Sequence, residues 1–367
     1  LAGIKDSVYV DGWNYFIYER YSGGHQSYMA RIPKDNFSLA AMEFILPSNI
    51  NTNLRGFSGI ATDGTYVYAC VYANGVLTGN NNYQGHVMRV PCDSFNPESI
   101  EYFNVNDHTG VSGTNTNLRG HNGCFTDPNG NWLFLVPYSY GSPYSPYLVR
   151  IDLNDFSASG VEWCNLTNVT GGSSSNKGFS GGFAYAGRGY VFGGYGGGGI
   201  GYHGQVVRFS LGIAKGSFDA ATYQTISLDS ISTSYRGFGK GYGIGNFVYL
   251  IPSYNGSSYH SNFIRIAIDN FTSTGVHKLD IPHPDGNNRI GHNGGFTDGY
   301  YAYVSNYHGG GSAGDSTYGG TRYLWRLDPT DFAPCSWTLI DLEKQIQTDT
   351  YLSNGLRPHT LKPHLKH

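Results

Sequence analysis

Apolar and polar residues alternate in short runs along nearly the whole chain, and residues typical of tight turns separate the runs. The segment 65–72 reads TYVYACVY, with β-branched and aromatic residues at the alternating positions of a half-buried strand. Asp63 and Gly64 come just before it and form a dipeptide that strongly predicts a hairpin. Only the short stretch 342–346 has helical spacing. The pattern therefore predicts an all-β protein.

The same order of predicted strands recurs six times. In the second copy, residues 55–105, four runs follow one another: RGFSGIATDG, TYVYACVY, GHVMRVP and SIEYFNV. Each copy contains an arginine flanked by apolar residues, and a phenylalanine follows it after a short turn. The arginines recur at intervals of about 60 residues and are Arg31, Arg89, Arg150, Arg208, Arg265 and Arg326. The phenylalanines are Phe37, Phe95, Phe156, Phe218 (after a short insertion), Phe271 and Phe332.

Six antiparallel units of four strands each, without helices, predict a six-bladed β-propeller of four-stranded antiparallel blades. We expect one propeller over residues 1–342, with blades of about 1–50, 51–110, 111–170, 171–230, 231–283 and 284–342. Residues 343–367 form a C-terminal tail. Its sequence at 356–359 resembles 118–121, so it is expected to dock near the first copy and help close the ring; a truncated seventh blade is the alternative.

Glycine-glycine-aromatic steps occur at 181–183 and 294–296. In these steps and in its architecture the chain resembles the kelch-like and lectin-like propellers. The kelch signature is incomplete, and the Asp box of sialidase propellers is missing. The resemblance therefore implies a fold and a lectin-like recognition role, without a specific family.

Composition narrows the range of partners. Only 13% of residues are charged, the net charge is −3, and the chain has 53 glycines and 31 tyrosines. Because there is no basic stripe, a nucleic acid partner is not expected. The longest apolar runs, such as 132–137, are too short for a membrane span. The chain begins with Leu1, which fits removal of a signal peptide and fits a shortened chain equally well. We expect a secreted or extracellular protein.

Five cysteines form neither a CxxC motif nor an even framework. Cys70 and Cys92 lie in neighbouring predicted strands and could pair in an oxidising compartment. N-x-S/T sequons mark possible glycosylation sites, although a chain this rich in Asn, Ser and Thr acquires several by chance. The sequons begin at Asn36, Asn165, Asn168, Asn255 and Asn270.

Strand order separates two propeller faces. The first-to-second and third-to-fourth turns are short and stereotyped, whereas the second-to-third loops are long and differ in every copy. Recognition usually resides in variable loops on a rigid frame, and tyrosine gives a large contact area at low entropic cost. The ligand-binding candidates near these loops are Tyr72, Tyr83, His86, His121, Tyr140, Tyr195, His203, Tyr254, His260, His292 and His308.

The histidines have two interpretations. Each imidazole could bond to a loop carbonyl, or several could converge on zinc or nickel at the channel mouth. They come from different blades without fixed spacing, so we expect no metal and no cofactor. The six repeated arginines could form an anion-binding ring. Their third-strand position, away from the channel, instead predicts interblade bonds to backbone carbonyls. The basic residues Arg55, Arg119, Lys177 and Arg236 are better ligand candidates, with interblade bonding as their alternative.

No Ser-His-Asp motif, phosphate-binding loop or HExxH string is present. The acidic residues on the loop face, Asp107, Asp229, Asp285 and Asp315, are scattered. The sequence thus predicts a non-catalytic extracellular recognition module that binds a glycan or a protein. A self-assembling structural subunit of an extracellular layer or appendage is the alternative. A polysaccharide-acting enzyme, which would need two opposed carboxylates, is a further one.

Overall fold

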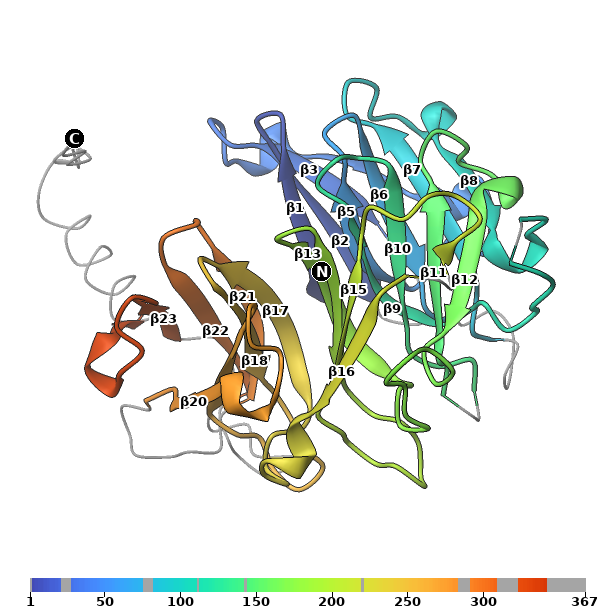
Figure 1. Ribbon diagram of the computed structural model, residues 1–367. Coiled ribbons are helices and arrows are strands. Elements are labelled where there is room, and N and C mark those ends of the chain that lie inside the picture. The colour runs from blue at the N-terminus through green and yellow to red at the C-terminus, as the bar shows by residue number, and fades with distance from the viewer. Residues whose placement is uncertain are drawn as a thin grey trace, which may run out of the picture.

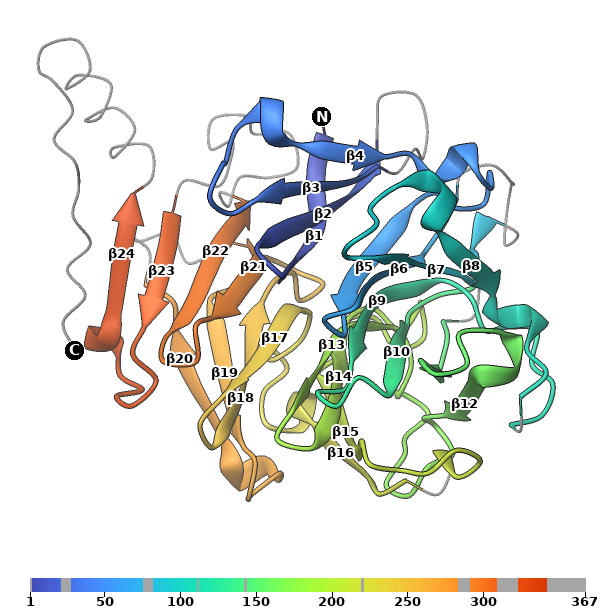
Figure 2. The same cartoon turned by 90° about the horizontal axis from the view of Figure 1, so that it is seen from above.

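The computed structural model is a six-bladed β-propeller, as predicted (Figures 1 and 2). Each of its six sheets has four antiparallel strands that follow one another in chain order. The structure describes residues 2–20, 28–74, 82–110, 112–141, 144–218, 221–282, 291–308 and 323–341. The predicted tail and the 342–346 stretch lie outside these ranges, as do Asp285 and Asp315. No helix in the described part of the chain has the length and apolar character needed to cross a bilayer.

The strands occupy four positions in each blade. The innermost strands are β1 (Ala2–Val10), β5 (Phe57–Thr62), β9 (His121–Thr126), β13 (Phe179–Tyr185), β17 (Phe238–Ile244) and β21 (Gly291–Thr297). The second strands are β2 (Trp13–Arg20), β6 (Tyr66–Val71), β10 (Trp132–Pro137), β14 (Arg188–Gly193), β18 (Phe247–Pro252) and β22 (Ala302–His308). The third strands are β3 (Met29–Pro33), β7 (His86–Pro91), β11 (Tyr147–Asp152), β15 (Gln205–Ser210), β19 (Asn262–Ala267) and β23 (Tyr323–Leu327). The outermost strands are β4 (Glu43–Ile45), β8 (Glu101–Asn104), β12 (Val161–Asn165), β16 (Tyr223–Ser227), β20 (Val276–Asp280) and β24 (Trp337–Asp341).

Within the described residues, short 3-10 turns lie between the third and fourth strands of blades 1, 2, 3, 5 and 6, and the strand pattern did not predict them. At two of these turns a polar side chain just before the turn accepts a backbone N–H at its start, which favours this geometry. In blade 2 the Asn96 side chain accepts from the Ser99 amide, and in blade 3 the Ser157 side chain accepts from the Ser159 amide. The turns span Leu39–Ala41, Pro97–Ser99, Ala158–Gly160, Ser273–Gly275 and Pro334–Ser336.

The innermost strands are arranged around a common axis (Figure 2). β5 packs between β1 and β9, and the series continues through β13 and β17 to β21. Each inner strand contains a register shift, with Ser58, Asn122 and Ser180 as the extra residues in blades 2, 3 and 4. A bulge of this kind re-aims one side chain without ending the strand. Here it directs a polar side chain toward the neighbouring blade.

Five hydrophobic clusters hold consecutive blades together. One cluster joins Tyr15 and Ile17 of blade 1 to Val67 and Met88 of blade 2, and equivalent clusters follow at the next four blade junctions. The alternation along each strand explains this layout, since successive side chains point to opposite sheet faces and each face packs on a different neighbour. The clusters therefore lie between the blades.

The repeated arginines also lie between blades. Arg150 is fully buried; its Nη1 donates to the Ile213 carbonyl of blade 4 at 2.8 Å, and its Nη2 bonds Glu162 at 2.7 Å. The guanidinium lies 3.8 Å from the ring centroid of Trp132 and 4.5 Å from that of Phe218. These contacts stabilise the angle between two blades. The repeated phenylalanine thus contacts the arginine of the preceding blade, not that of its own blade.

None of the five cysteines forms a disulfide, so the suggested Cys70–Cys92 pair does not form. The two side chains point to opposite faces of blade 2, because Cys70 packs toward blade 3 and Cys92 toward blade 1. The Cys70 thiol instead lies beside the Cys124 thiol of blade 3, which raises the pKa of Cys124. Among the sequon asparagines, Asn36, Asn168 and Asn270 are exposed, and Asn165 and Asn255 are half-buried.

Candidate functional site

Eight tyrosines from four consecutive blades form a continuous arc of ring contacts, which we call the tyrosine arc. Adjacent ring centroids are 5.0 to 5.6 Å apart, and most neighbouring rings meet edge to face or at a tilt. Such geometries are favourable for aromatic pairs. In contact order the members are Tyr83, Tyr72, Tyr138, Tyr144, Tyr195, Tyr202, Tyr254 and Tyr259.

Each of blades 2 to 5 contributes two tyrosines, one on either side of its second-to-third loop. In blade 4, Tyr195 follows β14 and Tyr202 precedes β15, and the two residues form an isolated antiparallel bridge. Corresponding bridges involve Tyr83, Tyr144 and the pair Tyr254 and Tyr259. The bridge fixes the base of each loop, so the tyrosines are held by strand geometry.

In blades 2 to 5 the segment before the inner strand packs against the arc or the residues next to it. Gly178 and Gly237 have φ values of +73° and +65°, and an added Cβ at either position would overlap the carbonyl of Tyr195 or Tyr254. Only glycine adopts this conformation readily and permits such a close approach. This contact explains why the sequence repeats a basic residue followed by glycine at this point.

All eight arc side chains are half-buried, so part of each remains accessible to solvent. Burial raises the pKa of Tyr72, Tyr138, Tyr144 and Tyr202 above the usual value of a phenol. Their hydroxyls therefore stay protonated at neutral pH. The arc presents aromatic faces and O–H groups without charge.

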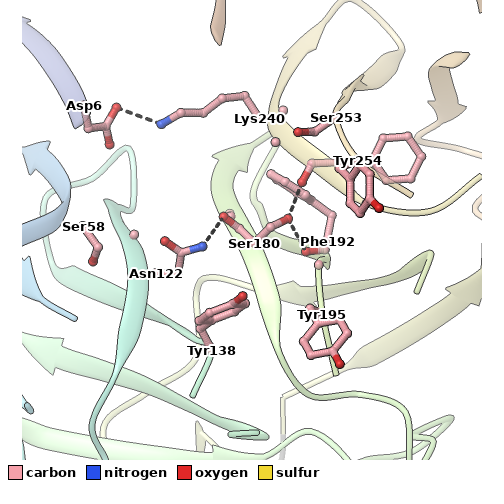
Figure 3. A pocket seen from close by; sticks show the side chains of 18 of the residues that line it. Asp6, Ser58, Asn122, Tyr138, Ser180, Phe192, Tyr195, Lys240, Ser253 and Tyr254 are labelled. Carbon is pink, nitrogen blue, oxygen red and sulfur yellow. Dashed lines mark hydrogen bonds and ion pairs between the residues drawn. The ribbon is translucent and has the colours of Figure 1, made fainter. Parts of the chain in front are cut away.

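The cavity between the innermost strands, called the channel below, has a volume of about 240 Å³. Four arc members line it: Tyr138, Tyr195 and Tyr254 (Figure 3), and Tyr202. Deeper in, bulge residues link neighbouring blades: Ser58 donates to the His121 carbonyl at 2.6 Å, and Asn122 donates to the Ser180 carbonyl at 3.1 Å. Ser180 in turn donates to the Phe238 carbonyl. These bonds form a polar lining that also connects four blades.

An ion pair crosses the channel. Lys240 Nζ on β17 lies 2.8 Å from Asp6 Oδ1 on β1, and both side chains are partly exposed (Figure 3). Among the described residues that line the cavity, Asp6 is the one carboxylate. Its charge is matched by Lys240, so the channel does not present two opposed carboxylates.

A shallower hollow lies beside the arc, between blades 3 and 4. It is lined by Tyr140, Tyr144, Asn168 and Lys177, and the Tyr140 ring stacks on Tyr147 at 6.4 Å. Tyr140 is thus adjacent to the arc without being one of its members. The sequon asparagine Asn168 is therefore one of the residues that line this hollow.

The structure brings together four of the five tyrosines predicted from the sequence: Tyr72, Tyr83, Tyr195 and Tyr254. The histidines are placed differently, since His86, His121, His203, His260 and His292 are all buried. The side chain of His308 lies outside the described residues. The predicted set therefore divides into an accessible tyrosine surface and histidines behind it.

His203 and His260 have equivalent places in blades 4 and 5. The Nε2–H of His203 donates to the Lys177 carbonyl and that of His260 to the Arg236 carbonyl, each at 2.8 Å. Burial lowers the pKa of His203, and it lowers that of His260 to about 4. Both imidazoles are therefore neutral at physiological pH and hold the backbone on which the arc rests.

His121 and His292 occupy the position that phenylalanine has in blades 2, 4 and 5, at the first buried site of the inner strand. Burial lowers the pKa of His121 to about 4. The His292 ring packs edge to face on Trp325 at 5.1 Å. Within the described ranges, no three His, Cys, Asp or Glu side chains gather in a way that could hold a metal ion.

Four arc members, Tyr138, Tyr144, Tyr202 and Tyr259, were missed at the sequence level. The available signal was the pair of tyrosines that brackets each second-to-third loop in blades 2 to 5. Tyr144 and Tyr259 belong to loops whose differing lengths obscure that pattern. The channel residues Asp6 and Lys240 carried no such signal, because their contact depends on ring closure between distant blades.

The described geometry can be set beside known proteins. No family model matches the chain, and no curated protein matches it in sequence. A solved prolyl endopeptidase structure aligns with a TM-score of 0.54 and 13% identity over 92% of this chain and 41% of its own. The extracellular domain of a hybrid two-component system from B. thetaiotaomicron aligns with a TM-score of 0.53 and 10% identity, covering 92% of this chain and 36% of its own. The chain spans less than half of either protein, and the likeness concerns the fold alone.

Proposed function

We propose that this propeller is a non-catalytic extracellular recognition module that binds an extended glycan along the tyrosine arc. The main support for this proposal is the arc itself, which is a continuous, uncharged aromatic surface built by four blades. Sugar rings have apolar faces bordered by hydroxyls. A tyrosine matches both features, because its apolar ring can pack on the sugar face and its protonated O–H can bond to a sugar hydroxyl.

The shape of the surface favours one extended ligand over several equivalent sites. The ring contacts run without interruption from Tyr83 to Tyr259, whereas the loops beyond them differ in every blade. Equivalent sites would require equivalent loops. A ligand that follows the arc would instead contact several tyrosines at once, so its affinity would rise with chain length.

The channel supports a binding role more than a catalytic one. Glycoside hydrolysis uses two carboxylates on opposite sides of the scissile bond. The lining offers Asp6, and Lys240 already pairs with it. The polar bulge residues are likewise engaged in interblade bonds.

A glycan array followed by calorimetry with the bound oligosaccharide tests the proposal. We expect binding by the intact chain, and a loss of about tenfold in affinity for Tyr195→Ala, since truncating an anchoring aromatic typically costs this much or more. Tyr102→Ala is the matched control, because Tyr102 is 38% exposed on the outermost strand β8, away from the arc. An array without any bound glycan, or equal losses for both variants, would refute glycan recognition by the arc.

A further inference from the structure

Five of the six blade junctions share one three-part contact, which we call the arginine socket. Its parts are the third-strand arginine, the aromatic residue opposite it on the second strand, and the repeated phenylalanine of the next blade. At the junction of blades 4 and 5, these are Arg208, Tyr190 and Phe271. Across the five junctions the phenylalanine ring lies 4.1 to 4.8 Å from the guanidinium and 5.6 to 6.3 Å from the second-strand ring.

Each socket also receives a backbone acceptor from the next blade. In four junctions it is the carbonyl three positions before the phenylalanine, as with Cys92 and Phe95. The third junction uses the Ile213 and Ala214 carbonyls because of the insertion before Phe218. The acceptors in the other four are Cys92, Leu153, Ile268 and Pro329.

Blade 6 carries a socket without a phenylalanine. Arg326 lies opposite Tyr303 on β22 and 4.5 Å from the Tyr301 ring, yet its side chain is exposed. Phe296 stacks on Tyr303 at 4.6 Å but is 56% exposed, whereas the equivalent Phe125 of blade 3 is 7% exposed. Among the described residues, no packing comparable to that of the other junctions joins β21 to β1.

Blade 1 carries the missing part. Phe37 is 75% exposed, whereas its counterparts Phe95, Phe218 and Phe271 are buried. The turn before it is built as in the other blades: the Lys34 amide donates to Gly12 at 2.8 Å, as the Cys92 amide donates to Thr65 at 2.9 Å. The Lys34 carbonyl therefore has the position that an acceptor has at the other junctions.

We propose that the edge of blade 6 is an interaction surface for blade 1 of the same chain. Phe37 then packs on Arg326 and Tyr303, and the guanidinium donates to the Lys34 carbonyl. The edge of blade 6 and the facing side of blade 1 border the same junction of one ring (Figure 2). Because both belong to one chain, blade 1 has a higher effective concentration at this edge than a second molecule has. The proposal is independent of glycan binding.

Chemical denaturation of single and double variants tests this contact. Phe37→Ala and Arg326→Ala should each raise the unfolding equilibrium constant by about tenfold. The double variant should show less than the product of the two effects, because each change removes the same contact. Phe37→Tyr should retain the wild-type value. Leu39→Ala is the control, since Leu39 is 83% exposed nearby and has no role in the socket.

Two results would overturn the proposal. One is that Phe37→Ala and Arg326→Ala behave like Leu39→Ala, or that their effects simply multiply. The other concerns the occupant and is measured by sedimentation velocity: a wild-type chain that associates with itself, with Phe37→Ala and Arg326→Ala variants that are monomeric. In that case blade 1 of a second copy fills the socket. Both residues are exposed in the structure, so the variants should fold.

Discussion

At the residue scale, the repeated arginines show how a charged side chain can stabilise an interblade boundary. Arg31 has a carboxylate, a tyrosine hydroxyl and the Cys92 carbonyl as hydrogen-bond acceptors, and aromatic rings cover its guanidinium. Burying the charge is tolerable because its donors are satisfied. The degree of burial then decides how much each arginine contributes.

Arg150 is expected to contribute most. The side chains of Arg150 and Glu162 are 0% and 1% exposed. Arg150→Met should lower the free energy of unfolding by about 3–5 kcal/mol, because it leaves Glu162 charged and buried. Urea denaturation measures this. Lys278→Ala is the control and should cost under about 0.5 kcal/mol, since its pair with Asp280 is solvent-exposed. Similar effects in the two variants would contradict the argument.

His121 should make the fold sensitive to acid. Its pKa is about 4 in the folded state and about 6.5 in the unfolded chain, so the unfolded chain binds more protons between these values. The free energy of unfolding is therefore not reduced by His121 above about pH 6.5. It falls as the pH drops toward 4, by at most about 1.4 kcal/mol per pH unit for each such histidine.

His121→Phe tests that contribution, because phenylalanine occupies the equivalent site in blades 2, 4 and 5. We expect near wild-type stability at pH 7.5 and a shallower loss of stability between pH 6.5 and 4.5. The remaining slope belongs in part to His260, whose pKa is also about 4. Urea denaturation across this range measures the slope, and an unchanged slope would exclude His121 as a contributor.

At the scale of elements, the inner strand and the segment before it perform two tasks. The bulge residue bonds to the next blade, and the preceding glycine lets the backbone pass close to the arc. One short segment thereby connects interblade packing with the position of the binding surface. A change in its backbone should affect both.

Gly237→Ala should lower the free energy of unfolding by more than about 2 kcal/mol, since the residue has φ +65° and its Cβ would overlap the Tyr254 carbonyl. It should also weaken glycan binding, because Tyr254 belongs to the arc. Gly198→Ala is the control: its φ is outside the left-handed region and an added Cβ meets no atom within 4 Å. Calorimetry and denaturation should both separate the two variants.

At the scale of the whole molecule, four blades build the proposed site and the ring sets its curvature. The arc begins in blade 2 and ends in blade 5. Blades 1 and 6 contribute Asp6 to the channel and, as proposed, the last arginine socket. Binding and ring closure can therefore be tested separately.

Glycan affinity should rise with oligosaccharide length until the ligand spans the arc, and then level off. Calorimetry with a series of purified oligomers measures this dependence. Tyr83→Ala and Tyr259→Ala, at the two ends, should reduce the affinity for long oligomers and leave that for the shortest ones nearly unchanged. Equal affinity for all lengths would indicate a single pocket and contradict an extended site.

The sequence alone was sufficient to predict the six blades, their strand order and the variable loop face. These features follow from local physics: alternation sets the strands, Asp-Gly and similar steps set the turns, and the spacing of Arg31 and its counterparts sets the repeat. It also identified Tyr72, Tyr83, Tyr195 and Tyr254 as members of a candidate surface. It did not separate them from His121 or His260, because a polar residue in a loop-rich segment has the same sequence signature whether buried or accessible.

Tertiary structure alone decided which of these residues meet. The interblade contacts of the tyrosine arc, the Asp6–Lys240 ion pair and the partnership of each arginine with the following blade join positions about 50 or more residues apart. Such contacts depend on how blades are oriented around an axis, and no local spacing encodes that orientation. The alternating pattern determined which side chains point to each face of a sheet. The arrangement of the blades around the ring determined which residues of the neighbouring blade those side chains contact.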